Sequence, residues 1–362
     1  MIVSIVDGEE ILGRENREIS ILVATEAVTI TRARYSVGEQ VAGPHVHHQH
    51  TDAFYVLEGE LTFEIGCEGK TITVSSGGFV AVPPEVSHSL RNDSDRPARW
   101  LTIHAPDGGF AAFMRGIRDG VEVEWDISAV PADGGLPQAK RSSDRETPEP
   151  SAQRRRPWAA RVCSRATTSG VASCISVRQA LGVVPEARLD STEHGLVPTG
   201  EGWFVLNARK ARWYHAEGRP AFCDLEGDQN FPQLGINVQV LLPGDAMAMY
   251  HWEADQEDFL VLSGEAHLIV EGEERPLRAW DFVHCPAETK HTIVGAGDGP
   301  CVVVAVGTRA HADSPDWGGY TVDEVALRHT AGVEKETNEP REAYAHVTKR
   351  EHARYRDGWL PG

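Results

Sequence analysis

The sequence predicts an all-β protein made of two antiparallel β-barrels or jelly rolls with short flanking helices. Three observations support this fold class. The chain has 362 residues, and at roughly 150 residues per domain this length favours two domains. Short β-branched and aromatic runs alternate with glycine, asparagine and aspartate, which is typical of antiparallel sandwiches and barrels. The same arrangement of runs then occurs a second time along the chain.

The first set of predicted strands lies between residues 19 and 104. The strands are expected at Ile19–Val23, Thr29–Arg34, Phe54–Leu57, Leu61–Ile65, Thr71–Val74, Phe79–Val82 and Trp100–His104. Leu61, Phe63 and Ile65 alternate with polar residues, which is the two-residue period of a half-buried strand. After this set, Phe110, Phe113, Met114 and Ile117 recur at helical spacing. We therefore expect a short amphipathic helix at the end of the first domain.

The second β-rich region begins near Glu201, and its core, Val238–Val306, can be laid over Thr31–Ile103. In both copies five residues separate a proline from a histidine, Pro83 from His88 and Pro286 from His291. We expect an N-terminal barrel over residues 1–130, a linker over 131–187, a C-terminal barrel over 188–318 and a helical extension over 319–362. In the linker, residues 140–165 hold eight Lys and Arg against three Asp and Glu. This composition favours a flexible basic linker over an arm for an acidic partner.

Composition and charge narrow the classes of partner. The formal net charge is −19, which repels phosphate backbones and anionic lipid, so nucleic acid and membranes are poor candidates. The N-terminus has no long apolar run, and we expect a cytoplasmic protein. The six cysteines form no CxxC pair, so the pattern indicates neither a disulfide framework nor a thiolate zinc site.

The first copy presents a candidate metal site. His45 and His47 are two residues apart on a predicted strand, so both imidazoles point to the same face of the sheet. Asp52 and His88 would complete a set of three nitrogen ligands and one oxygen ligand, which suits Fe, Mn, Ni, Cu or Zn. In an octahedral site these ligands leave two open positions, as catalysis or ligand binding requires.

The second copy presents His251, Glu253, Glu257 and His291 in the same order. Two carboxylates and two imidazoles make a more anionic set of ligands, suited to metals that prefer oxygen. Alternatively, this copy is degenerate and its polar groups are satisfied by hydrogen bonds and water.

Other polar residues of the first copy have two interpretations each. His48 and His50 could be spare ligands, although solvated side chains on the opposite face are more usual. His104 could face the pocket or the solvent. Tyr55 is a candidate pocket hydroxyl with a catalytic role, and Asp52 is a candidate proton acceptor as well as a ligand.

The paired segments resemble the cupin superfamily. The family motif G(X)5HXH(X)3-4E(X)6G matches GEQVAGPHVHHQHTDAFYVLEG, and G(X)5PXG(X)2H(X)3N matches GGFVAVPPEVSHSLRN. Asp52 replaces the motif's glutamate and Glu85 replaces a glycine. The second copy, GDAMAMYHWEADQEDFLVLSG and WDFVHCPAETKHTIVG, departs further, with Glu253 for histidine and with Trp280 and Glu288 for glycine. The resemblance implies a bicupin, two small barrels that can each hold one metal ion.

Cupins have many functions, so the resemblance limits activity only loosely. The first copy is most similar to the flavonol-dioxygenase-like cupins, which implies a mononuclear-metal dioxygenase acting on a small oxygenated organic molecule. Two alternatives stay open: a bicupin that binds a small molecule without turning it over, and a cupin isomerase or decarboxylase. The resemblance also implies a homodimer, or a pseudo-dimer of the two halves.

Overall fold

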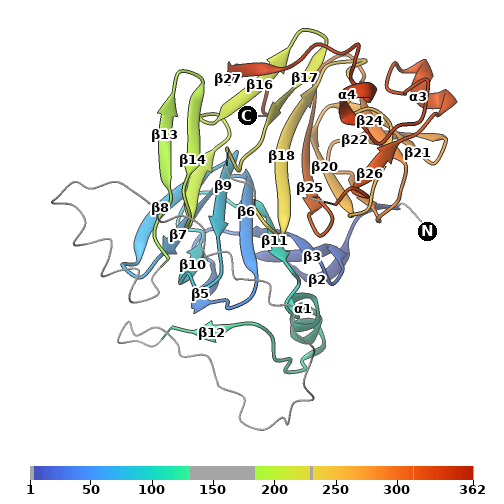
Figure 1. The fold of residues 1–362 in the computed structure, drawn as a ribbon. Coiled ribbons are helices and arrows are strands. Elements are labelled where there is room, and N and C mark those ends of the chain that lie inside the picture. The colour runs from blue at the N-terminus through green and yellow to red at the C-terminus, as the bar shows by residue number, and fades with distance from the viewer. Residues whose placement is uncertain (1–3, 131–183, 229–230, 313, 362) are drawn as a thin grey trace, which may run out of the picture.

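The computed structural model describes residues 4–130, 184–228, 231–312 and 314–361. Their architecture is two β-barrels, drawn in blue to green and in yellow to red in Figure 1. Each barrel consists of a large and a small antiparallel sheet. The all-β class predicted from the repeat is therefore confirmed. Most of the expected linker, residues 131–183, lies outside the described residues.

The N-terminal barrel consists of a seven-stranded sheet and a five-stranded sheet. The large sheet has the order β15-β9-β6-β11-β4-β3-β2 and the small sheet the order β12-β5-β10-β7-β8. The strands are β2 (Glu9–Arg14), β3 (Arg17–Ala24), β4 (Thr29–Tyr35), β5 (Gln40–Val46), β6 (Thr51–Glu58), β7 (Glu60–Ile65), β8 (Lys70–Ser75), β9 (Gly78–Val82), β10 (His88–Arg91), β11 (Ala98–Ala105), β12 (Ser128–Ala129) and β15 (Phe204–Asn207). Alternate residues of these strands fill the interior, including Leu61, Phe63 and Ile65 as the two-residue period predicted.

The C-terminal barrel repeats this plan with an eight-stranded and a five-stranded sheet. Their orders are β1-β23-β20-β25-β18-β17-β16-β27 and β22-β21-β24-β19-β26, and β13 pairs with β14 in a separate hairpin. The strands are β1 (Ser4–Val6), β13 (Arg188–Thr192), β14 (Gly195–Thr199), β16 (Arg212–Ala216), β17 (Arg219–Cys223), β18 (Leu234–Leu241), β19 (His251–Glu253), β20 (Glu257–Ser263), β21 (Glu265–Val270), β22 (Glu273–Arg278), β23 (Phe282–Cys285), β24 (His291–Ala296), β25 (Cys301–Thr308), β26 (Gly318–Tyr320) and β27 (Glu351–Arg354).

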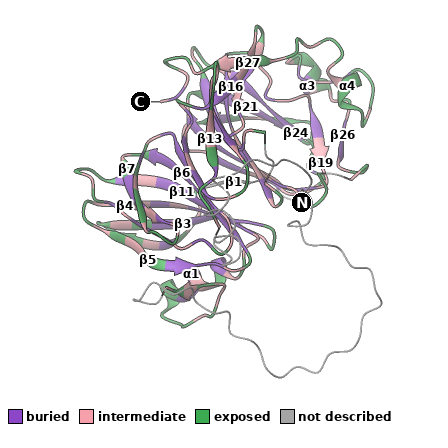
Figure 2. Ribbon diagram, turned by 60° about the vertical axis from the view of Figure 1, so that its left-hand side comes forward, coloured by how far each residue is buried: buried purple, intermediate pink, exposed green. Residues whose placement is uncertain are grey.

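The two barrels exchange edge strands, which the sequence did not predict. β1, at the start of the chain, pairs with β23 of the C-terminal barrel, and Figure 2 shows the N-terminus beside that barrel. In return, β15, within the range expected for the C-terminal barrel, pairs with β9 of the N-terminal barrel. Each exchange covers the exposed edge of a neighbouring strand. Each barrel therefore contains one strand that comes from the sequence range expected for the other barrel.

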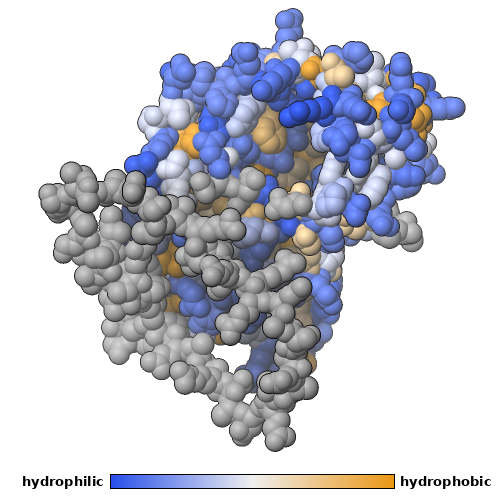
Figure 3. All heavy atoms as spheres, viewed as in Figure 1, coloured by the Kyte–Doolittle hydropathy of each residue, from blue (hydrophilic) through white to orange (hydrophobic). Residues whose placement is uncertain are grey.

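A continuous apolar core joins the barrels. It contains Tyr55, Phe79 and Leu101 from the N-terminal large sheet and Trp213 and Val304 from the C-terminal one, all buried. Figure 2 shows buried strands running through the centre of both barrels, with exposed residues in the outer loops. In Figure 3 the surface of the C-terminal barrel is mainly hydrophilic. The two halves thus pack against each other within one chain.

The described helices are short and lie at the ends of the barrels. They are α1 (Phe110–Asp119), α3 (Glu324–Arg328) and α4 (Pro340–Ala343). Helix α1 buries Phe110 and Met114, as its periodicity predicted, whereas Ile117 is exposed. Within the described ranges no helix is both long and apolar enough to cross a bilayer. The C-terminal extension also contributes β27 to the large sheet of its barrel, where β27 pairs with β16.

Candidate metal centres

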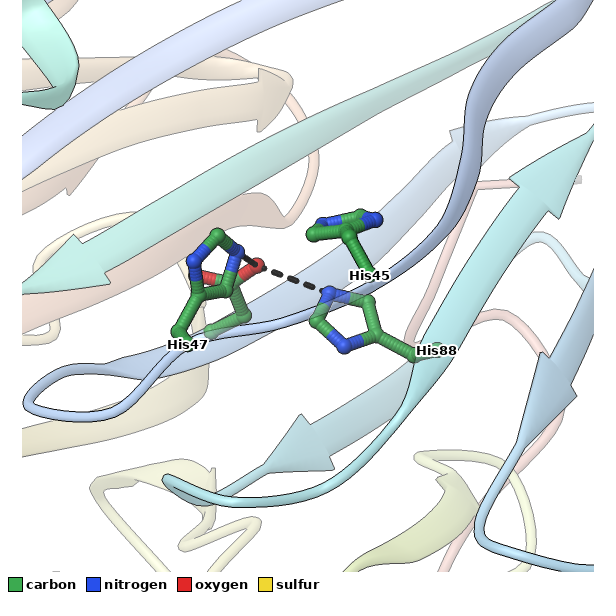
Figure 4. A group of neighbouring side chains, drawn as sticks. His45, His47 and His88 are labelled. Atoms are coloured by element: carbon green, nitrogen blue, oxygen red, sulfur yellow. Dashed lines mark hydrogen bonds and ion pairs between the residues drawn. The ribbon is translucent and has the colours of Figure 1, made fainter. Parts of the chain in front are cut away.

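The structure brings together the four residues proposed as metal ligands in the N-terminal barrel. His45 lies on β5, Asp52 on β6 and His88 on β10, and His47 directly follows β5. His45 and His88 are cross-strand partners, so their rings lie side by side (Figure 4). At most 8% of any of these four residues is exposed. A buried group of three imidazoles and one carboxylate needs partners of matching chemistry.

The backbone fixes the orientation of all three imidazoles. The Nδ1 atoms of His45, His47 and His88 lie within hydrogen-bond distance of the carbonyl oxygens of Gly43, Asp126 and Val86. Because a carbonyl only accepts, each Nδ1 must carry the proton and donate it. The Nε2 lone pairs are therefore free, and this is the tautomer that metal-ligating histidines adopt.

The free nitrogens face the carboxylate of Asp52. Oδ2 of Asp52 is 3.2 Å from Nε2 of His47 and 3.1 Å from Nε2 of His88. Nε2 of His47 and Oδ1 of Asp52 are fully buried and have no hydrogen-bond partner of suitable geometry. Converging lone pairs without protons between them would repel one another, and a bound cation would remove that repulsion. The residues present therefore fit a divalent metal ion.

Electrostatics keep these groups in the forms that bind metal. Burial lowers the pKa of His45 to about 3, with His88 and His47 adding to the shift, so this imidazole is neutral near neutral pH. Burial alone would raise the pKa of Asp52, but positive charge on the surrounding histidines, His104 and His47 foremost, would hold it well below its ordinary range. A carboxylate with so low a pKa is a good ligand and a weak base.

Two further histidines, left open between pocket and solvent by the sequence, point into the same cluster. His50 is 0% exposed and His104 is 3% exposed. The Nε2 atom of each lies 3.2 Å from Oδ1 of Asp52. His104 is the direct cross-strand partner of Asp52. That pairing was not legible in the sequence, although His104 shares its strand face with Trp100, which lies in the barrel core.

Two other candidates lie outside the cluster. Tyr55 is three residues from Asp52 on β6, so it points to the opposite face, into the core between the barrels. The structure therefore does not bring this proposed catalytic hydroxyl to the cluster, and the odd spacing was the available signal. His48 is partly exposed, and its ring contacts Glu85 and Ser128 at 2.9 Å.

The C-terminal barrel holds a smaller group with the same construction. His251 on β19 and His291 on β24 are cross-strand partners, and Glu257 lies on β20. The Nδ1 atoms donate to the carbonyl oxygens of Met249 and Thr289 at 2.8 and 3.0 Å. Oε2 of Glu257 is 3.5 Å from Nε2 of His251 and 3.2 Å from Nε2 of His291. Oε2 of Glu257 and Nε2 of His291 also lack hydrogen-bond partners, so this group fits a metal ion as well.

Glu253 lies beside this group, although it was proposed as a fourth ligand. His251, Glu257 and His291 converge, while Oε1 of Glu253 approaches only His251, at 3.5 Å. Burial and the charge of Glu257 raise the pKa of Glu253. Burial alone would lower the pKa of His251, but Glu253 and Glu257 raise it well above its ordinary value. A metal ion must therefore displace a proton from this group when it binds.

A pocket opens onto the C-terminal group. Its volume is about 210 Å³. Aromatic residues Phe259, Trp317, Tyr320 and Tyr344 line it together with Glu253. Tyr344 follows α4, and its hydroxyl accepts a hydrogen bond from the backbone nitrogen of Met249. The C-terminal extension therefore forms part of the pocket wall.

Comparison with known families agrees with this geometry. The model of the Cupin domain family matches residues 31–104 and 237–307, one match in each barrel. The chain carries two cupin domains. The two segments of this bicupin that match the family model are also the segments that contain the candidate ligands.

Individual relatives cover different parts of the bicupin. Quercetin 2,3-dioxygenase of Bacillus subtilis is 36% identical over 78 residues, which is 22% of each chain. The match therefore spans about a fifth of that relative's length. A crystal structure described as that of a glyoxylate-induced protein from Pseudomonas aeruginosa aligns over 85% of the bicupin and 84% of its own chain, with 13% identity and a TM-score of 0.50. A variant of Bacillus subtilis oxalate decarboxylase covers 84% and 76%, with 16% identity and a TM-score of 0.48. At 13% identity the Pseudomonas structure shows likeness of fold alone.

Proposed function

We propose that this bicupin is a metal-dependent enzyme of the dioxygenase type that acts on a small oxygen-bearing organic molecule. The observation that carries the proposal is the convergence of imidazole Nε2 atoms, oriented by Nδ1–carbonyl hydrogen bonds, on one carboxylate in each barrel. The local similarity to a quercetin dioxygenase supports the reaction class.

The two barrels offer different environments for the reaction. The N-terminal ligands are enclosed, since at most 8% of each residue is exposed. In the C-terminal barrel, two histidines and one carboxylate face the 210 Å³ pocket. Two histidines and one carboxylate are the ligand set of many non-haem iron oxygenases, and they leave positions open for substrate. We therefore place the organic substrate in the C-terminal pocket and keep the N-terminal cluster as a second metal centre.

The residues of the pocket have separate roles in this proposal. A divalent transition metal, when bound, would acidify a substrate hydroxyl and supply the redox chemistry for dioxygen. The aromatic side chains would hold the apolar body of the substrate, and Tyr344 would close one wall. Glu253 lines the pocket outside the converging group, so it is positioned to accept the hydroxyl proton. Asp52, whose two oxygens face imidazoles, is better suited as a ligand than as the proton acceptor considered from the sequence.

The test is oxygen consumption by metal-reconstituted protein with a panel of catechols, flavonols and diketones. We expect metal-dependent uptake of oxygen that His291→Ala abolishes and Glu253→Gln lowers by roughly 10²-fold or more. His194→Ala, at a half-buried position of the turn between β13 and β14 that does not line the pocket, is the matched control and should retain full activity. If His88→Ala abolished activity and His291→Ala did not, the reaction would have to take place in the N-terminal barrel.

Two outcomes would contradict the dioxygenase proposal. Turnover of a substrate without oxygen would favour the isomerase or decarboxylase alternative. Saturable binding of a panel compound without any turnover, in protein with full metal content, would favour a non-catalytic binding protein. Isothermal calorimetry on the same samples, alongside product analysis with and without oxygen, separates these outcomes.

A further inference from the structure

We propose that the N-terminal barrel holds two metal ions side by side, the second bound by His50, His104 and Oδ1 of Asp52. Asp52 then bridges the two ions, with Oδ2 on the ion held by His45, His47 and His88. This inference rests on the metal binding proposed above and extends it from one ion to a dinuclear centre. Its ligand is a second divalent transition metal ion of the Fe, Mn, Co or Zn type.

The two oxygens of Asp52 divide the surrounding histidines into two sets. Oδ2 lies 3.2 Å from His47 and 3.1 Å from His88. Oδ1 lies 3.2 Å from His50 and 3.2 Å from His104. A carboxylate with nitrogen atoms grouped around each oxygen has the arrangement of a bridging ligand. Carboxylate-bridged ions in two-metal sites lie about 3.5–4 Å apart.

One ion cannot use all of these groups. Ligand atoms about 2.0–2.2 Å from one ion lie no more than about 4.4 Å from each other. In the described part of the N-terminal barrel, the potential ligand atoms that lie within 4.8 Å of one another form two overlapping sets. His45 and His88 belong only to the first set and His50 and His104 only to the second, while His47 and Asp52 belong to both. Since Nε2 of His47 serves one ion, its contact with Oδ2 assigns it to the first.

His50 is held in the tautomer and orientation that metal binding requires. Its Nδ1 donates to Oδ2 of Asp126 at 3.0 Å. The Asp126 carboxylate also accepts from the backbone nitrogens of His48 and Gln49, so it is fixed as well. Nε2 of His50 is completely buried and has no hydrogen-bond partner, and the same is true of Oδ1 of Asp52. A carboxylate behind the distal nitrogen of a ligating histidine is a common support of metal sites.

Aromatic residues hold the second set in place. His104 stacks on Phe110 of α1, with ring centroids 3.6 Å apart and an interplanar angle of 19°. Trp125 stacks over His50 at 5.7 Å and 22°. Asp126 and Trp125 lie between α1 and β12, and β12 pairs with β5. The segment after α1 thus covers this part of the cluster and orients its histidines.

The C-terminal barrel provides a contrast within the same chain. There, a single oxygen, Oε2 of Glu257, faces both His251 and His291. The cross-strand partner of Glu257 is Gly307, where the N-terminal barrel pairs Asp52 with His104. The residue two positions before Glu257 is Asp255, where the N-terminal barrel has His50. Among its described residues, the C-terminal barrel therefore brings together a single group of potential ligands.

The test counts metal ions in the full-length chain. His251→Ala and His291→Ala are combined to silence the C-terminal site, and the apoprotein is reconstituted with Mn(II) and freed of excess metal. Elemental analysis should then find about two ions per chain. His50→Gln and His104→Phe should each lower this value to about one, while His48→Gln, the neighbouring control, should leave it unchanged. Circular dichroism confirms that each variant is folded.

Electron paramagnetic resonance gives a second readout that does not depend on activity. Two Mn(II) ions bridged by Asp52 should give a spin-coupled signal, which His50→Gln and His104→Phe should convert to that of an isolated ion. Asp126→Asn should lower the affinity for the second ion by roughly 10–100-fold, because the Asp126 carboxylate orients His50. The affinity for the first ion should be kept, because His47 is held by the backbone carbonyl of Asp126. One ion per chain that both variants retain, or loss of every ion in a folded His50→Gln protein, would overturn the proposal. A coupled pair in a protein that consumes no oxygen would contradict only the proposed function.

Discussion

Single residues show where this chain departs from the usual cupin pattern. Glu85, Trp280 and Glu288 stand where the second motif has glycine, and their φ angles are 68°, 77° and 66°. The turns therefore keep a left-handed backbone that favours glycine. By contrast, Gly59 and Gly264 are retained, because a Cβ atom there would lie 2.4 Å from the carbonyl oxygens of Pro97 and Pro300. The motif glycines are therefore replaced at positions where a side chain costs only backbone strain. Glycine is kept at the positions where a Cβ atom would overlap a carbonyl oxygen.

We expect Glu288→Gly to stabilise the protein. Glu288 is exposed, so little packing is lost, and relief of the left-handed conformation is worth about 1–2 kcal/mol against an entropic cost of about 0.5–1 kcal/mol. Urea unfolding should show a net gain of up to about 1.5 kcal/mol. Lys290→Gly is the matched control: it is nearby and exposed with no left-handed φ, so it should lose stability. Equal losses in both variants would refute the strain argument.

Asp224 gives the folded protein a pH dependence away from the candidate metal centres. Burial, partly offset by Arg212, raises its pKa to about 7. Because the folded state binds this proton more tightly than the unfolded state, the group's contribution to stability falls as pH rises from about 4 to about 7. Asp224→Asn should therefore gain stability over wild type through this window, on the order of 1–2 kcal/mol by pH 7.5 after allowance for solvent screening.

Asp228 is the control of opposite sign. A hydrogen bond from Arg212 lowers its pKa, so its contribution is present above about pH 4 and is lost as pH falls. Asp228→Asn should then lose stability at neutral pH and converge with wild type in acid. Thermal unfolding of both variants from pH 4 to pH 8 measures the two slopes. Parallel profiles for Asp224→Asn and wild type would contradict the assignment.

At the scale of elements, the exchanged strand β15 ties the barrels together. Phe204 is 3% exposed, and its ring stacks on Phe231 and packs near Phe79. Phe204→Ala should lower the free energy of unfolding by about 3–5 kcal/mol, because it opens a cavity in the core shared by both barrels. Ile117→Ala, at an exposed position of α1, should change it by less than about 0.5 kcal/mol. Denaturant titrations followed by tryptophan fluorescence compare the two, and a small effect of Phe204→Ala would show that β15 adds little to this core.

The strands β12 and β26, which pair beside the two groups, explain together with the segments before them why two similar barrels have different sites. Strand β12 pairs with β5 beside His45, and β26 pairs with β19 beside His251. In the N-terminal barrel the segment before β12 places Trp125 and Asp126 over the histidines. In the C-terminal barrel the corresponding space is the pocket lined by Trp317 and Tyr320. The same barrel plan thus gives an enclosed cluster in one half and an open pocket in the other.

At the scale of the whole molecule, the continuous core predicts that the barrels unfold together. Metal ions that bind only the folded chain stabilise it by about 2.7 kcal/mol when the free metal is a hundredfold above its dissociation constant. Treatment with a chelator should therefore lower Tm by several degrees in calorimetry while the unfolding peak stays single. Restoring the metal should restore Tm. Two separate peaks would contradict the shared core, and an unchanged Tm would contradict metal binding.

The sequence alone determined the all-β fold, its duplication and the first set of candidate ligands, because each depends on short spacings. His45 and His47 share a strand face, and the proline-to-histidine interval recurs in both copies. Asp52 and Tyr55 are three residues apart on one strand, and this odd spacing already indicated that their side chains point to opposite faces of the sheet. Local periodicity is visible in any single strand, since side chains alternate with every residue.

Only the tertiary structure decided which strands are neighbours and which side chains meet. It paired His104 with Asp52, oriented His50 into the cluster through a hydrogen bond to Asp126, and left Glu253 beside the converging group of the C-terminal barrel. It also exchanged β1 and β15 between the barrels. Apart from the position of Glu253, which depends on loop geometry, these contacts join residues 52 to 280 positions apart, for example His104 with Asp52 and Ser4 with His284. They follow from the register and closure of whole sheets, and no short-range pattern encodes these.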